Sequence, residues 1–393
     1  MNQLVESLKA IKIKYLIQLL FISGFLLSQS KLYYQKNGDN PYSPSASIVF
    51  KDKIILNMEE PGKGNELFSY DEENGFQLIK DIYAGEYSSS PHEFAIYKDK
   101  LYFAATNAEF GTELWGYDGV NEPQLVSNIV SDQYNSNPTY LTVFNDKLYF
   151  SAATRGPPDY YRNLLSYDGN EVKVVGNYTG YERRRITDII VFKNHLYFGS
   201  SRDDYGETSN ECSELFKMDK NEVVMGTYNH NNSCNSIGAK QLTVFKDKLY
   251  YVVDARNSAT ELWSYDGINI SYGPVSDIYP GLQSSNPQSL TVFNHKLYFR
   301  AISPDNADYL YQYDGINSPN IVYKDFTTKI DYRPSNLIGY SGNLYFAAQA
   351  FQDNQYDGVE LWITDGESSP ALLKDINPGF DSDPRYFLVY NDK

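Results

Sequence analysis

The sequence is poor in the side chains that most often build metal and redox sites. It contains two cysteines, four histidines and four methionines in 393 residues. So few histidines limit acid–base and metal chemistry without excluding them. Only one long apolar run is present, and it lies near the N-terminus, at residues 15–27. We therefore expect no bound metal, no cofactor and no membrane-spanning segment in the mature chain.

Positive charge is also scarce. Lysine and arginine number 34 against 50 aspartate and glutamate residues, so the formal net charge is −16. An acidic chain repels phosphate backbones and anionic membrane surfaces, which argues against a nucleic-acid partner. We interpret the acidity as a solvated, soluble surface.

The N-terminal 30 residues have the layout of a secretory signal peptide. Three lysines at 9–14 precede the apolar run Tyr15–Leu27, and Ser28 and Ser30 offer small residues for cleavage near Ser30. The run is shorter than the roughly 20 residues that span a bilayer, although an uncleaved anchor is the alternative. We predict a signal peptide at 1–30 and a secreted or cell-surface mature chain.

Export would place the two cysteines, Cys212 and Cys234, in an oxidising compartment, where an isolated pair usually forms a disulfide. They lie in the longest repeat, so we predict that a disulfide fixes this insertion. A catalytic thiol near His230 is the alternative. Three sequons that could carry glycans begin at Asn177, Asn231 and Asn269.

The sequence is rich in aromatic residues, with 37 tyrosines and 21 phenylalanines, and many of them fall in one repeated phrase. Its copies begin 47 to 53 residues apart, and an apolar run precedes each of them. A run ending in Asp or Asp-Gly and then a fourth short run follow, so each unit predicts four strands joined by turns. The copies are Lys53–Leu56, Lys100–Phe103, Lys147–Phe150, His195–Phe198, Lys248–Tyr251, Lys296–Phe299 and Asn343–Phe346.

Large apolar residues at adjacent strand positions point to both faces of a sheet, which is typical of blades covered on both sides. We predict an all-β fold, a β-propeller of about seven four-stranded blades that forms a single domain over residues 31–393. A β-solenoid is the rival, but the hairpin turns require antiparallel neighbours. An eighth upstream run, Phe387–Tyr390, ends the sequence, and Lys31–Tyr34 carries the phrase that should follow it. Either the sequence stops inside a partial eighth repeat, or the two termini exchange a strand.

Several phrases resemble the ELWxxDGT repeat of secreted and surface proteins from Bacteroidetes-type bacteria. The closest are Glu113–Trp115, Glu261–Trp263 and Glu360–Trp362, each followed by Asp-Gly. The resemblance covers residues 46–393 and implies an exported repeat protein. The terminal Thr is absent from every copy, and Trp is kept in three. The family has no agreed catalytic residues, so none is transferred to this chain.

We expect a non-enzymatic binding propeller whose partner is an extracellular protein or glycan. The alternatives are a carbohydrate-active hydrolase or lyase on a propeller scaffold, and a purely structural adhesin module. The Asp-Gly aspartates are interpreted as turn residues and the tryptophans as packing residues. We expect the site where the repeat is broken, at Arg202–Cys212 with Asn229–Ser236, or at Thr154–Asn163. The oligomeric state stays open.

Overall fold

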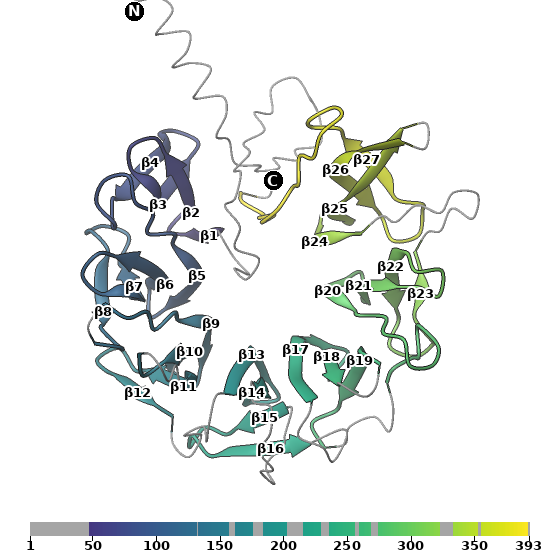
Figure 1. The fold of residues 1–393 in the computed structure, drawn as a ribbon, viewed down its shortest axis with the longest axis horizontal. Helices are drawn as coiled ribbons and strands as arrows, with labels where there is room; N and C mark the ends of the chain where they lie inside the picture. Colours follow the sequence, from purple (N-terminus) through teal and green to yellow (C-terminus); the bar gives the residue numbers. More distant parts are fainter. Residues whose placement is uncertain are drawn as a thin grey trace, which may run out of the picture. The chain divides into compact units, whose positions relative to one another are not determined.

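In the computed structural model, regular structure consists of 27 β-strands among the described residues (Figure 1). No helix in this part of the chain is long and apolar enough to cross a membrane. The predicted signal peptide, Lys31–Tyr34, both cysteines and the three sequon asparagines lie outside it. The described residues are 47–131, 133–156, 162–175, 184–202, 215–228, 236–255, 259–268, 274–322, 333–352 and 355–391.

The chain divides into two compact units, and the first contains residues up to Val174 together with Tyr386–Lys393. It holds three four-stranded antiparallel sheets, which are blades 1 to 3. Blade 1 comprises β1 (Ser47–Phe50), β2 (Lys53–Glu60), β3 (Gly64–Asp71) and β4 (Gly75–Lys80). Blade 2 comprises β5 (His92–Tyr97), β6 (Lys100–Asn107), β7 (Gly111–Tyr117) and β8 (Gln124–Ser127). Blade 3 comprises β9 (Thr139–Phe144), β10 (Lys147–Ala153), β11 (Arg162–Tyr167) and β12 (Val172–Val174).

The second unit, Val175–Arg385, holds blades 4 to 7. Blade 4 comprises β13 (Arg184–Phe192), β14 (His195–Arg202), β15 (Leu215–Met218) and β16 (Val224–Tyr228). Blade 5 comprises β17 (Ser236–Phe245), β18 (Lys248–Ala255) and β19 (Glu261–Tyr265). Blade 6 comprises β20 (Gln288–Phe293), β21 (Lys296–Ile302), β22 (Asp308–Tyr313) and β23 (Asn320–Ile321). Blade 7 comprises β24 (Ser335–Tyr340), β25 (Asn343–Gln352), β26 (Gln355–Thr364) and β27 (Ala371–Lys374). In blade 5 the Val275 N–H donates to the Leu262 carbonyl (2.7 Å), where other blades pair their fourth strand.

The strands of each blade follow one another in sequence order, joined by tight antiparallel turns. In blade 3, for example, Asn145 and Asp146 connect β9 to β10 with φ of 46° and 59°. Both central residues of a type I′ turn need positive φ, which Asn and Asp tolerate better than most residues. The same two-residue connection recurs between the first and second strand of all seven blades.

The second strand of each blade is buried on both faces, as the adjacent apolar residues predicted. In β6, Leu101 and Phe103 pack against Phe50 of blade 1, whereas Tyr102 packs against Leu148 of blade 3. Each blade therefore buries its apolar side chains between two neighbours. Seven blades of this kind make the protein a seven-bladed β-propeller, which confirms the predicted fold class.

Candidate functional site on the linker face

The turns of each blade lie at two opposite ends of its strands, because successive turns of an antiparallel meander alternate between ends. We call one end the Asp-Gly face; in blade 2 it carries the first turn, 98–99, and the Asp-Gly turn, 118–123. We call the other end the linker face; it carries the turn between second and third strands, 108–110, and the linker to the next blade, 128–138.

The Asp-Gly face uses its aspartates to hold its own turns. Asp118 Oδ1 accepts hydrogen bonds from the backbone N–H groups of Val120 and Asn121, both at 2.8 Å. The Asn121 side chain and these N–H groups lower the pKa of Asp118 to about 2. Lys51 of blade 1 donates to the Asp118 carbonyl (2.8 Å), so the turn also joins neighbouring blades. The predicted role of these aspartates as turn residues is confirmed.

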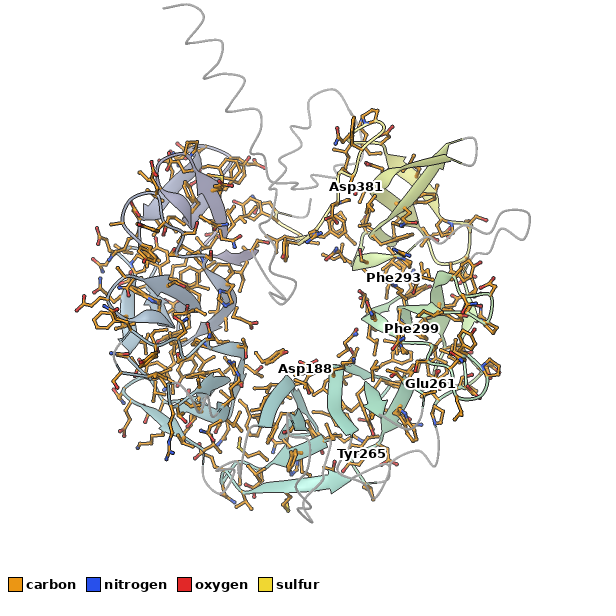
Figure 2. All side chains as sticks on the ribbon, in the orientation of Figure 1. Asp188, Glu261, Tyr265, Phe293, Phe299 and Asp381 are labelled. Atoms are coloured by element: carbon orange, nitrogen blue, oxygen red, sulfur yellow. The ribbon has the colours of Figure 1, made fainter. Side chains whose placement is uncertain are left out.

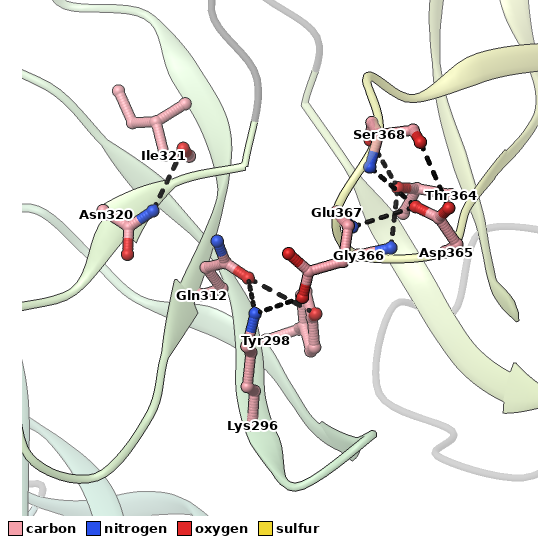
Figure 3. A network of polar contacts seen from close by, with 10 residues as sticks. All are labelled: Lys296, Tyr298, Gln312, Asn320, Ile321, Thr364, Asp365, Gly366, Glu367 and Ser368. Atoms are coloured by element: carbon pink, nitrogen blue, oxygen red, sulfur yellow. Dashed lines mark hydrogen bonds and ion pairs between the residues drawn. The ribbon is translucent and has the colours of Figure 1, made fainter. Parts of the chain in front are cut away.

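Blade 7 shows the same arrangement with different partners (Figure 3). Asp365 accepts from the N–H of Glu367 (2.9 Å) and of Ser368 (2.7 Å). Lys296 of blade 6 contacts the carboxylate of Glu367 (2.8 Å) and the amide oxygen of Gln312 (3.0 Å). The Asp-Gly turn is thus a joint between blades here as well.

The glutamate that opens the Glu-Leu-Trp phrase is buried and binds the linker that follows its blade. Glu113 in β7 accepts from the N–H of Ile129 (3.0 Å) and from the N–H (3.2 Å) and hydroxyl (2.7 Å) of Ser136. The Ser136 carbonyl accepts from Ala153 of blade 3 (2.8 Å), so this serine joins two blades. We call this arrangement the Glu–Ser junction. It recurs with Glu66 and Ser89, Glu261 and Ser285, and Glu360 and Ser382.

Burial raises the pKa of these glutamates, in Glu113 to about 7, although their hydrogen bonds lower it. Asp188 of β13 behaves in the same way: burial raises its pKa to about 6 while it accepts from the Leu242 N–H (2.8 Å). Glu261 and Asp188 are labelled in Figure 2, where they lie within the blades. A raised carboxyl pKa often marks a catalytic acid. Here both acids are committed to backbone groups of the next blade, so their shifts have a structural cause.

The linker face differs from the Asp-Gly face in that its segments vary in length. Between second and third strands, blade 7 has two residues (353–354), blade 3 has eight (154–161) and blade 4 has twelve (203–214). The segments predicted to form the site, Arg202–Cys212, Asn229–Ser236 and Thr154–Asn163, all connect strands at this face. Most of their residues lie outside the described part of the chain. Their position in the strand order nevertheless assigns the irregular segments to one face.

Large apolar side chains are exposed on the linkers of this face. Tyr87 is 65% exposed, Leu282 84% and Phe380 71%. The Tyr87 ring stacks on Tyr83 with centroids 5.0 Å apart. The linkers are held close to the neighbouring turn: a Cβ at Gly64 would lie 2.4 Å from the Tyr87 carbonyl oxygen. These side chains are therefore presented on a backbone with little freedom to shift.

The Asp-Gly face also exposes apolar residues, but they are smaller and belong to constant turns. Val120, Ile268 and Ile316 are 83% to 86% exposed at the position after Asp-Gly. None of the three is aromatic. They provide a matched set of exposed positions against which the linker face can be tested.

Blade 6 contains a group of polar side chains that breaks the repeat. Arg300 and Asp308 form a two-pronged ion pair, with Nε–Oδ1 at 2.8 Å and Nη2–Oδ2 at 2.7 Å. Tyr309 occupies the position of the junction glutamate, and its hydroxyl donates to Asp305 (3.1 Å). Asn306 in the same turn accepts from Tyr279 of the preceding linker (2.9 Å). The acids are paired with a cation or a phenol, which suits positioning better than proton transfer.

Two of the tryptophans donate hydrogen bonds to backbone carbonyls within their own blade. Trp115 is buried and donates to the Ala105 carbonyl (3.0 Å), and Trp362 donates to that of Ala348 (3.2 Å). These two residues pack the blades, as predicted. Sequence reasoning missed the exposed Tyr87, Leu282 and Phe380. The signal was available, because the linkers of blades 5 and 7 place the last two directly after Pro-Gly.

The propeller class is also found among solved structures. A prolyl endopeptidase aligns over 84% of this chain and 50% of its own, with 13% identity and a TM-score of 0.53. A puromycin-hydrolysing peptidase of Mycobacterium tuberculosis aligns over 88% and 54%, with 8% identity and a TM-score of 0.50. The β-propeller domain of the trilobed protease of Pyrococcus furiosus aligns over 85% and 98%, with 13% identity and a TM-score of 0.49.

The chain thus spans about half the length of the two peptidases. At these identities the likeness concerns the fold alone. No protein-family profile matches the chain. No curated protein matches it either.

Proposed function

We propose that the protein is an exported, non-enzymatic binding propeller that holds an extracellular protein or glycan on its linker face. One observation carries the proposal: segment length varies on the linker face, while the first turn has two residues in every blade. Variable loops on a constant scaffold are a common way to build a binding surface. The exposed Tyr87, Leu282 and Phe380 supply apolar contact area of the kind that binding surfaces use.

The repeat-signature acids do not support a catalytic alternative as the first choice. Glu66, Glu113, Glu261 and Glu360 are 0% to 2% exposed and bound to linker groups. A glycan-cleaving enzyme needs two carboxyl groups that reach the substrate. Export, membership of the ELWxxDGT repeat class and a surface location belong to the same proposal, and they rest on the signal-like N-terminus and the repeated phrases.

Binding of the mature chain to a glycan array and to an array of extracellular proteins tests the proposal. A linker-face variant, Tyr87→Ser with Leu282→Ser, should lose at least tenfold in affinity for whatever the chain binds. The matched Asp-Gly-face variant, Val120→Ser with Ile268→Ser, should bind like the unmodified chain. Loss confined to the second variant would move the site to the other face, and turnover of a bound glycan would favour an enzyme.

A further inference from the structure

The last residues of the described chain fold like the first strand of a blade, although no second strand pairs with them there. Tyr386 has a φ of 57° and Asp383 a φ of 46°, which match Ser289 (57°) and Asn286 (45°) at the start of blade 6. Residues 385–390 also repeat the order of exposed, half-buried and buried positions of β20. The backbone is therefore already set as a first strand.

The same segment contacts blade 1 as a preceding blade would. The Tyr390 hydroxyl donates to the Asp52 carbonyl (2.7 Å). Tyr97 of blade 2 donates to Asp146 in the equivalent turn of blade 3 (2.6 Å). Leu388 and Tyr390 pack in one cluster with Ile54, Leu56 and Phe68 of blade 1. An eighth first strand is therefore docked on blade 1 by the contacts that join neighbouring blades.

In the seven complete repeats the first strand pairs with a second strand that starts two residues later. Residues 387–390 have no such ladder partner among the described residues. A strand edge offers a row of backbone donors and acceptors that a further strand can bind. The residue after Tyr390, Asn391, even has the positive φ (50°) of the first turn position.

We infer that Lys31–Tyr34 of the same chain pairs antiparallel with 387–390 and supplies the missing second strand. The phrase Lys-Leu-Tyr-Tyr is a copy of the second-strand phrase, as at Lys248–Tyr251. In blade 6 the pairs are Phe293 with Lys296 and Val292 with Leu297. The same register sets Tyr390 opposite Lys31, Val389 opposite Leu32 and Leu388 opposite Tyr33.

The proposed strand is within reach of its place. From Tyr34 to Ser47, where β1 begins, the chain advances 13 residues. An extended chain of that length covers up to about 43 Å, since each residue contributes roughly 3.3 Å. The edge lies beside blade 1, to which the tether leads, because Tyr390 contacts Asp52. The fit is also chemical, since the Leu and Tyr of this phrase are buried in blades 2, 3 and 6.

A disulfide test distinguishes this register from its alternatives. Val389→Cys combined with Leu32→Cys in the full chain should form a bridge within one chain, identified by mass spectrometry of the linked peptides. Val389→Cys with Tyr33→Cys is the matched control, because a neighbouring strand residue points to the other face. It should give less than a tenth of that bridge. Equal bridging in both variants, or bridges only between two chains, would overturn the proposal.

Hydrogen exchange gives a second readout that needs no cysteine. The amides of 387–390 should exchange at least tenfold faster after Leu32→Asp with Tyr33→Asp than in the unmodified chain. The amides of β20 should be unchanged, which also reports that the variant is folded. Unchanged exchange of 387–390 would show that another segment, or none, occupies the edge.

Discussion

Blades 2 and 6 use the same position of the repeat for different chemistry. In blade 2 the position holds Glu113, whose carboxylate binds Ile129 and Ser136 in the linker to the next blade. In blade 6 it holds Tyr309, which bonds to Asp305 of its own blade. Blade 2 thus uses the position to attach its neighbour, and blade 6 uses it to fix its own turn.

The difference extends to the linker sequences. Each of the four junction glutamates has its serine 22 to 24 residues later, in a Ser-x-Pro phrase. Before Pro334, which follows blade 6, the serine position holds Tyr332. A glutamate without its serine would be a buried carboxylate lacking a donor, which is costly. The two positions therefore change together, and the repeat can relax its junction only as a pair.

Breaking the ion pair of blade 6 should have the largest effect. Arg300→Ala leaves Asp308, which is 8% exposed, without its two-pronged partner. Removing one member of a buried pair typically costs about 3–5 kcal/mol, and partial exposure of Arg300 places this case near about 3 kcal/mol. Urea unfolding followed by tyrosine fluorescence measures the change.

The double variant Arg300→Ala with Asp308→Ala is the control for this comparison. It removes the unpaired charge and should recover more than half of the lost unfolding free energy. A double variant no more stable than Arg300→Ala alone would mean that packing, rather than charge, makes the Arg300 site important.

Opening one Glu–Ser junction should cost less. Glu113→Ala leaves the N–H of Ile129 and the N–H and hydroxyl of Ser136 without their acceptor. Unsatisfied buried donors cost about 1–3 kcal/mol each, and water entering the vacated space reduces this, so we expect about 2 kcal/mol. Ser136→Ala removes one donor and should cost about 1 kcal/mol by the same measurement. A larger loss for Ser136→Ala than for Glu113→Ala would contradict the junction as described.

The repeated strands could be predicted from sequence because their causes are local. Leu101 and Tyr102 are adjacent, so a strand must bury them on opposite faces, and Asp118-Gly119 marks a turn by its own conformational preference. The role of Glu113 could not be predicted, since its partner Ser136 becomes a neighbour only after three strands have folded. The predicted Cys212–Cys234 disulfide stays a prediction, because both residues lie outside the described chain.

The smallest effect we expect is a pH dependence that separates titrating from non-titrating junction positions. Burial raises the pKa of Glu113 from 4.5 to about 7. The folded chain therefore binds the Glu113 proton more tightly than the unfolded chain does. The stability that this proton contributes is complete below pH 4.5 and is lost as the pH rises through about 7.

Blade 3 provides the matched control, because Asn163 occupies the equivalent position, is 8% exposed and does not titrate. Its amide donates to the Thr154 hydroxyl (2.6 Å). The melting-temperature difference between the unmodified chain and Glu113→Gln should shrink from pH 4.5 to pH 8. The corresponding difference for Asn163→Ala should stay constant over that range, because no proton is linked to it. Parallel pH profiles for the two variants would place the Glu113 carboxyl in a more solvated setting than the buried Glu–Ser junction.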